Sequence, residues 1–320
     1  MTTDIRTPQT SQQTVDLLSA SLGIPSVKLE KPTRLLDLCD GLHERIPPEL
    51  YHARELGVVS NSALKEAGRS MRHYYTWSTT PSDDDTKALF VGRAFHVATL
   101  EPDEFAKLYL VAPKFGDLRK TANKDRRESW CRDHGFRVVD GDIVDATDKG
   151  RELLDAADHE RIVGMVRSVR EHPLASRMIA GGKAEVTALW TDSETGLRCK
   201  SRMDYYVSSR SAIFDLKSTT DASLRSFSRD VFNYGYHRQH ALYRSAVAAL
   251  GVPAKHFVFI AVEKEPPYAV ATYQLDDVGI AAAHRDVRAI MTQIAECVRT
   301  STWPAYPTNI QKIETPKWAA

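Results

Sequence analysis

Hydrophobic and polar positions alternate with a helical period through much of the first half of the chain. Apolar side chains recur at three- and four-residue steps, which predicts helices over 63–77, 86–100 and 146–180. Ser60 or Ser62 stands where it can cap the first of them. A helical N-terminal half is therefore expected.

The pattern changes after residue 183. Short β-prone runs separated by turn sequences predict three neighbouring strands at 184–190, 197–206 and 211–217. A long helix over 221–250 follows, then two more strands at 256–264 and 269–275, a helix over 276–299 and a Pro-rich tail. This order favours a mixed α/β core against which the helical half packs. We expect a weakly ordered arm at 1–35 and a single domain over 36–320.

Charge and cysteine content exclude several classes of protein. The 320 residues contain 43 Lys or Arg and 42 Asp or Glu, which excludes a polybasic coating protein and an acidic disordered one. Its 4 cysteines form no CxxC, so a zinc ribbon or a clustered iron–sulfur site is not expected. No signal peptide or long apolar run is present, which predicts a soluble cytoplasmic protein without a membrane partner.

Two aspartates and a lysine carry the first candidate chemistry. Asp204 lies in one predicted strand, and Asp215 and Lys217 lie in the next. Residues two apart face the same side of a strand, so two acids and a lysine can converge on a small volume. Hard cations such as Mg²⁺ prefer carboxylate oxygens, and such a site suits hydrolysis of a phosphodiester. The same spacing also fits two surface strands joined by a cross-strand ion pair.

Other residues bear on the choice between these interpretations. Glu185 on the preceding strand offers a third carboxylate or is a solvated strand residue. His96 lies in an apolar helix, where a packed or hydrogen-bonded histidine is more common than a ligand. Gln239 and Tyr243 stand four apart on one helix face, where they serve either a site or packing.

Taken in order, these segments resemble a known series of motifs. GRAFH, AEV, KSRMD, IFDLKST and YHRQHALY resemble the GxxxH helix, the acidic strand, the aspartate strand, the DxK strand and the QxxxY helix of RecB-like nucleases in the PD-(D/E)XK superfamily. Phrases outside the motifs, such as SNSALKEAGRSMRHYY and the closing WPAY and PKW, more closely resemble the RecE-type nuclease domains of the exonuclease VIII family. This resemblance spans about residues 40–318.

The resemblance implies a fold and a set of site residues. The fold is a PD-(D/E)XK nuclease core, a central mixed β-sheet flanked by helices. The implied metal ligands are His96, Asp204, Asp215 and the Leu216 carbonyl, for Mg²⁺ with Mn²⁺ as a substitute. Lys217 is the implied catalytic lysine, and Glu185, Gln239 and Tyr243 complete the site.

The implied activity is 5′-to-3′ degradation of one strand of linear double-stranded DNA, leaving 3′ single-stranded tails for recombination by strand annealing. Family members work with a RecT-like annealing protein, form rings reported as tetramers, and occur typically in phage or prophage recombination. The alternatives are an endonuclease or repair nuclease of the same superfamily, or a non-catalytic recombination scaffold that binds DNA ends.

Basic residues near the motifs suggest a path for DNA. Residues 197–255 contain ten Lys or Arg and four Asp or Glu, a net charge of +6 in a chain whose formal net charge is +1. Phosphate contacts give affinity without sequence readout. The candidates for such contacts are Lys200, Arg202, Arg225, Arg229 and Arg238. For any single arginine, an ordinary solvated face is the more common explanation. The basic segment 114–132 is either a DNA-facing or an inter-subunit loop.

Overall fold

A mixed β-sheet forms the centre of the molecule. A computed structural model describes residues 34–80, 86–147 and 150–314, so the predicted arm at 1–35 lies almost wholly outside the described residues. The strand order is β1-β7-β8-β9-β10-β11, and β2 also pairs with β8. These strands are β1 (Gly41–His43), β2 (Val58–Val59), β7 (Lys183–Thr191), β8 (Arg198–Val207), β9 (Ala212–Thr219), β10 (His256–Glu263) and β11 (Val270–Tyr273). All five predicted strands are confirmed within a few residues at each end.

The sheet is antiparallel except in two places. β9 and β10 run parallel because two helices, α10 (Leu224–Asn233) and α11 (Tyr236–Ala249), connect them. The short β2 is parallel to β8. The mixed α/β fold class predicted from the sequence is confirmed.

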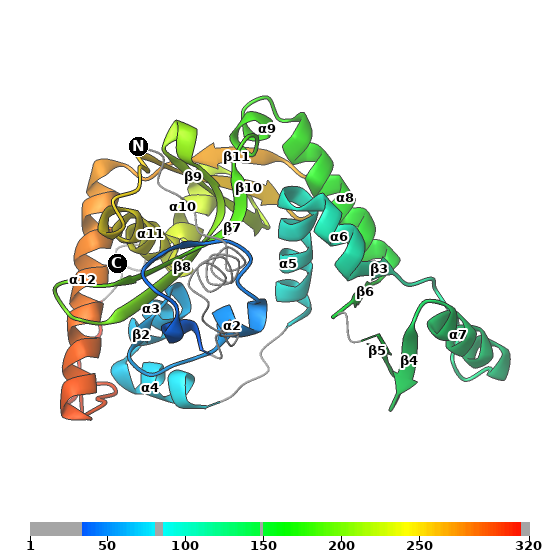
Figure 1. Cartoon of the computed structure of the whole chain (residues 1–320), viewed down its shortest axis with the longest axis horizontal. Coiled ribbons are helices and arrows are strands. Elements are labelled where there is room, and N and C mark those ends of the chain that lie inside the picture. Colours follow the sequence, from blue (N-terminus) through cyan, green and yellow to red (C-terminus); the bar gives the residue numbers. More distant parts are fainter. Residues whose placement is uncertain (1–33, 81–85, 148–149, 315–320) are drawn as a thin grey trace, which may run out of the picture.

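Helices cover both faces of the sheet (Figure 1). Successive residues alternate between two apolar clusters: Ile213 packs on one face, and Phe214 packs on the other. The first cluster includes residues of α3 (Asn61–Ala67), α4 (Met71–Thr79), α10, α11 and α12 (Asp277–Thr300). The second includes residues of α5 (Lys87–Leu100), α6 (Pro102–Leu108) and α8 (Ala156–Glu171).

Three predicted helices are interrupted. The helix expected over 221–250 is broken at Gly235, whose φ of 76° is a left-handed conformation that glycine adopts at little cost. The helix expected over 63–77 is two helices, and Ser60 and Ser70 each accept a hydrogen bond as N-caps. The segment 146–180 contains strand β6 (Glu152–Leu154) before α8, and the short α9 (Ala175–Met178) after it. The helices predicted at 86–100 and 276–299 are confirmed as α5 and α12.

The segment predicted as basic contains a helix in a projecting unit. α7 (Thr121–Asp133) packs beside the hairpin of β4 (Phe136–Val139) and β5 (Asp142–Asp145), away from the central sheet (Figure 1). The pair of β3 (Tyr109–Val111) with β6 links this unit to the rest. Short helical pieces complete the described chain: η1 (Leu35–Asp37), α2 (Pro48–His52) and η2 (Ser208–Arg210).

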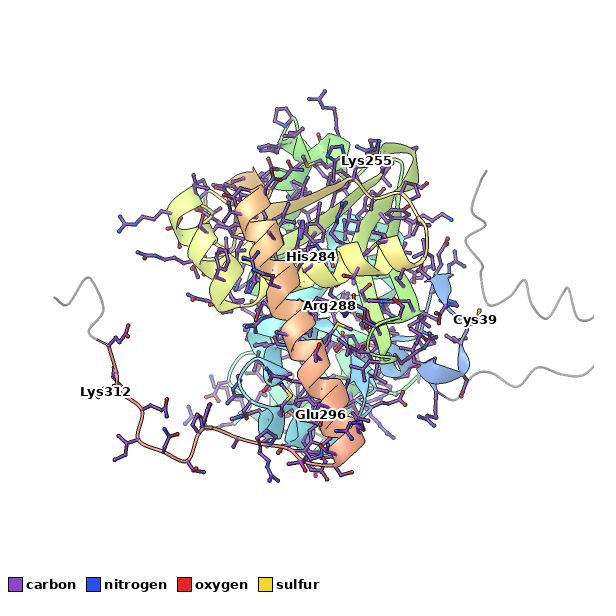
Figure 2. All side chains as sticks on the ribbon, turned by 90° about the vertical axis from the view of Figure 1, so that its left-hand side faces the viewer. Cys39, Lys255, His284, Arg288, Glu296 and Lys312 are labelled. Carbon is purple, nitrogen blue, oxygen red and sulfur yellow. The ribbon has the colours of Figure 1, made fainter. Side chains whose placement is uncertain are left out.

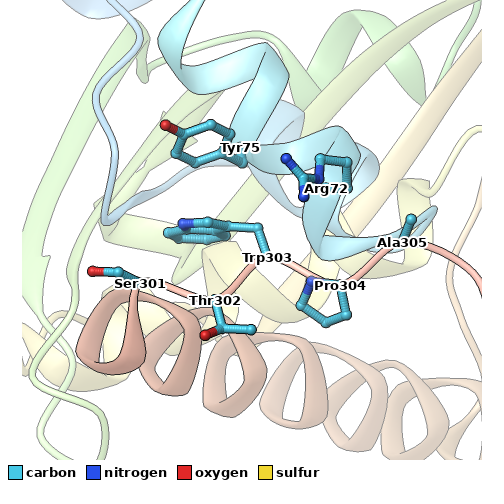
Figure 3. Close-up of a pocket in the computed structure, with 7 residues that line it drawn as sticks. All are labelled: Arg72, Tyr75, Ser301, Thr302, Trp303, Pro304 and Ala305. Atoms are coloured by element: carbon cyan, nitrogen blue, oxygen red, sulfur yellow. The ribbon is translucent and has the colours of Figure 1, made fainter.

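The C-terminal residues pack back onto the body. α12 crosses one side of the molecule (Figure 2), and its Arg288 forms an ion pair of 2.9 Å with Asp192 at the end of β7. Beyond it, the Trp303 ring lies 5.1 Å from that of Tyr75, and the Arg72 N–H donates to the Pro304 carbonyl (Figure 3). Among the described residues, no helix is long and apolar enough to cross a membrane.

Candidate active site

Three carboxylates stand in one row across β7, β8 and β9. The β7–β8 register pairs Ala184 with Tyr205 and Val186 with Met203, which places Glu185 opposite Asp204. The β8–β9 ladder ends at the pair of Tyr205 and Phe214, one step before Asp204 and Asp215. The acids predicted from the sequence are therefore brought together where strand pairing stops.

The missing strand pairing is replaced by a side-chain contact. Asp204 Oδ2 accepts a hydrogen bond of 2.8 Å from the Leu216 N–H. Glu185 has a φ of 51°, an uncommon conformation for a residue other than glycine. Local strain of this kind occurs often at functional sites. The backbone departs from regular strand geometry at the row of acids.

His96 approaches this row from α5. Its Nδ1 lies 3.6 Å from Asp204 Oδ2. One ligand atom each from His96, Glu185 and Asp204 lies within 4.8 Å of the others. Carboxylate oxygens and an imidazole suit a divalent cation, so these residues fit the metal that the PD-(D/E)XK resemblance implies. Glu185 was not among the metal ligands that the resemblance implies, yet the structure places it in one cluster with His96 and Asp204.

Asp215 is fully buried and contacts a second group of residues. Its carboxylate forms an ion pair with Lys217 and accepts a 2.6 Å hydrogen bond from Gln239 Nε2. The same Nε2 lies 3.1 Å from the Tyr243 hydroxyl. Gln239 and Tyr243 come from α11, so this helix supplies the hydrogen bond that fixes the Asp215 carboxylate.

The lysine is fixed by its surroundings. Lys217 Nζ lies 4.9 Å from the ring centroid of Tyr236, a cation–π contact. Burial lowers the pKa of Lys217, but the Asp215 and Asp204 carboxylates outweigh it, so the pKa is raised. The lysine is therefore favoured as a cation that can donate hydrogen bonds. Tyr236 was missed from the sequence, although its position three residues before Gln239 on α11 is a signal for a shared face.

Burial strongly perturbs the acids. It raises the pKa of Glu185 to about 8, with a further contribution from the neighbouring Asp204. Burial also raises the pKa of Asp215 to about 7 and that of Asp204 above its usual range. The pKa of His96 falls to about 4, because burial and then the Lys217 charge disfavour the imidazolium. A divalent cation binds a neutral imidazole and ionised carboxylates, so His96 is already in the binding state, whereas the acids would release their protons to a bound cation.

The predicted DNA contacts divide into two groups. Lys200 is 5% exposed and its ammonium donates to the Tyr51 and Ala53 carbonyls, so the structure does not support it as a DNA contact. Lys200 lies on a strand in which polar residues alternate, and that pattern does not indicate that its side chain is buried.

Two of the predicted arginines are also engaged within the protein. Arg202 donates to the Ile46 carbonyl at 2.8 Å and stacks on the Tyr51 ring at 4.0 Å. Arg238 forms an ion pair of 2.5 Å with Asp286. The structure therefore supports neither arginine as a DNA contact. Arg225 and Arg229 are exposed on α10 and form no hydrogen bond or ion pair with the rest of the described chain.

The matching family model identifies the family of the chain. Residues 60–316 match the model described as a PDDEXK-like domain of unknown function (DUF3799). The chain belongs to this family. None of the curated proteins matches the sequence.

Among solved structures, the chain resembles a protein of Eubacterium rectale described as a candidate exonuclease. The identity is 16% and the TM-score 0.53, over 85% of this chain and 97% of that one. At this identity the likeness shows a common fold. The family and the fold together support a nuclease of the PD-(D/E)XK superfamily.

Proposed function

We propose that this protein is a Mg²⁺-dependent 5′-to-3′ exonuclease that degrades one strand of linear double-stranded DNA and leaves 3′ single-stranded tails. The observation that carries the proposal is the row of Glu185, Asp204 and Asp215 beside Lys217. The three acids are half-buried or buried and have raised pKa values, so a bound cation would stabilise their ionised forms, and the fixed lysine beside them supplies positive charge for phosphodiester hydrolysis.

The metal would be held by His96, Asp204 and Glu185, with Asp215 and the Leu216 carbonyl completing the ligand set that the resemblance implies. Mn²⁺ can substitute, because it accepts the same oxygen and nitrogen ligands. When bound, the ion neutralises phosphate charge and acidifies water.

The protein's own groups then position the reaction. Lys217 donates hydrogen bonds to the attacking water or to the charge that develops on the phosphate, and its contacts with Asp215 and Tyr236 fix its direction. Gln239 holds the Asp215 carboxylate in place through its 2.6 Å hydrogen bond. Asp215 is fully buried, so bulk water is kept away from its hydrogen bond with Gln239.

The finer parts of the proposal are supported by the RecE-type resemblance. They are the 5′-to-3′ polarity, the use of double-stranded DNA ends, a RecT-like annealing protein as partner, and a homo-oligomeric ring such as a tetramer. A ring that encloses DNA accounts for processive degradation. A molar-mass measurement in solution tests the ring, and a monomer at all concentrations contradicts it.

One experiment tests activity, metal requirement and polarity together. Linear duplexes labelled at the 5′ or the 3′ end are incubated with Mg²⁺ or with chelator. We expect early release of the 5′ label with Mg²⁺ and no release with chelator. Lys217→Ala and Asp215→Ala should abolish release while the far-ultraviolet circular dichroism spectrum is retained.

Closed circular duplex separates the proposal from its alternatives. An exonuclease leaves circles intact, whereas rapid cutting of circles identifies an endonuclease of the same superfamily. If the protein binds duplex ends without releasing any nucleotide under Mg²⁺ or Mn²⁺, it is a non-catalytic end-binding scaffold.

A further inference from the structure

Three aromatic residues lie at the junction of α10 and α11. Phe232, Tyr234 and Tyr236 are spaced two residues apart across the break at Gly235, and we call them the aromatic strip. Phe232 is 52% exposed and Tyr234 is 54% exposed, unlike the buried aromatic residues that fill the core. Exposed apolar surface of this kind commonly marks a binding site.

The aromatic strip begins at the candidate active site. Tyr236 lies under the Lys217 ammonium, and its ring centroid is 5.8 Å from that of Tyr234. The Phe232 ring packs against the His237 ring, with 4.9 Å between the ring centroids. Aromatic contacts therefore extend from the proposed catalytic lysine through Tyr236 to the exposed Tyr234, and Phe232 adds a second exposed ring in the last turn of α10.

Positive charge lies beside the Phe232 end of the strip. Arg225, Arg229 and Phe232 occupy positions i, i+4 and i+7, on the face of α10 opposite the buried Phe227 and Val231. Asp230 is the one acid in α10, and it accepts a 2.9 Å hydrogen bond from Thr219 Oγ1. The two arginines form no ion pair with any described residue, so their charge is available to phosphates.

We propose that the aromatic strip, together with Arg225 and Arg229, is a platform on which unpaired bases of single-stranded DNA stack beside the active site. The proposal builds on the nuclease function above and names the form of DNA that lies next to Lys217. Rings stack on base faces that a duplex conceals, and every base has such a face, so the platform is sequence-tolerant. The arginines supply phosphate contacts along the same strand.

Binding in chelator tests the platform without any cleavage. The probes are a fluorescent oligothymidylate, the same oligonucleotide with abasic sites in place of its bases, and a blunt duplex of equal length. Loss of both exposed rings in Phe232→Ala/Tyr234→Ala should weaken oligothymidylate binding at least tenfold, because stacking contributes roughly fivefold or more in affinity per base. Duplex binding should change by less than about twofold.

Two control variants and one charge variant sharpen the result. Phe232→Tyr/Tyr234→Phe keeps the rings and should keep wild-type affinity. Tyr306→Ala removes another exposed aromatic residue, 64% exposed in the C-terminal tail, and should have no effect. Arg225→Gln/Arg229→Gln should flatten the dependence of log affinity on log salt by about 0.7 per lost phosphate contact.

Several outcomes would overturn the platform. These are unchanged binding in the alanine variant, an equal loss in Tyr306→Ala, or an equal loss on the duplex. Weaker self-association with intact oligothymidylate binding would instead identify a protein interface. If the alanine variant does not fold, binding by the wild type alone tests the platform. Equal affinity for oligothymidylate and for its abasic form would exclude base stacking. All of these measurements are independent of nucleotide release, so a failed platform leaves the nuclease proposal standing, and the reverse also holds.

Discussion

Replacing Gln239 with leucine isolates the contribution of one hydrogen bond to the site. Gln239 is 5% exposed, and its Nε2 donates at 2.6 Å to Asp215, a carboxylate with no exposed surface. Leucine keeps the volume of the side chain but removes the donor. A hydrogen bond to a charged group contributes about 1.5–3 kcal/mol, so the free energy of unfolding should fall by about that amount at a pH where Asp215 is ionised.

The same change should move the pH dependence of activity. The hydrogen bond favours the charged form of Asp215, so its loss raises a pKa that is already about 7. An energy of about 1.5–3 kcal/mol corresponds to roughly one to two pKa units. A carboxyl with a higher pKa keeps its proton to higher pH, where it competes with the metal. The acid limb of the activity profile should therefore shift upward by about one unit or more, and the variant should approach wild-type activity near pH 9.

The assay is nucleotide release from linear duplex across pH 6–9 at several Mg²⁺ concentrations, with urea unfolding measured in parallel. Tyr243→Phe is the matched control, because it removes only the hydroxyl 3.1 Å from Gln239 and leaves the bond to Asp215 intact. The control should keep the wild-type acid limb. An unshifted acid limb in Gln239→Leu, or an equal shift in Tyr243→Phe, would refute this reasoning.

Three further predictions concern neighbouring residues. Lys200→Met removes a buried donor to the Tyr51 and Ala53 carbonyls, so it should lower the free energy of unfolding by about 1–3 kcal/mol. The salt dependence of DNA binding should stay unchanged, and a flatter dependence would identify Lys200 as a phosphate contact after all. Glu185 has a raised pKa of about 8, so in chelator its contribution to stability is lost as pH rises from about 4 towards 8, and Glu185→Gln should melt above wild type by a margin that grows over that range. Gly235→Ala should cost about 1–2 kcal/mol in urea unfolding, because alanine strains a left-handed residue, and Gly235→Asn should cost less; equal costs would contradict that cause.

The sequence predicts the strands and most of the site for a physical reason. A strand has a fixed period of two, so Asp215 and Lys217 must share a face once β9 is assigned. Helical spacing likewise places Gln239 and Tyr243 together on α11. The breaks in the predicted helices were missed because apolar periodicity continues across Gly235 and across Gly68, the residue that ends α3. The direction of the chain after each break is set by tertiary packing, which no local pattern encodes.

Side-chain partners from distant segments were not predictable in this way. The carbonyls that accept from Lys200 come from residues 51 and 53, about 150 positions away in the chain. The pairing of Arg238 with Asp286 joins α11 to α12. No local pattern encodes such contacts, so a charge count over 197–255 overstated the positive surface available to DNA.

The break in the β8–β9 ladder gives a physical reason for the arrangement of the site. If β8 and β9 stayed paired past Tyr205 and Phe214, the Leu216 N–H would be used by the backbone, and Asp204 would lose its 2.8 Å partner. Separation of the strands instead frees the backbone at Leu216 to face the acids. The energy lost from the ladder is offset by that side-chain bond and, in the metal-bound protein, by neutralisation of clustered carboxylates whose pKa values burial has raised. In the proposed nuclease, the metal requirement would therefore rest on the backbone geometry at Leu216 as well as on the ligands.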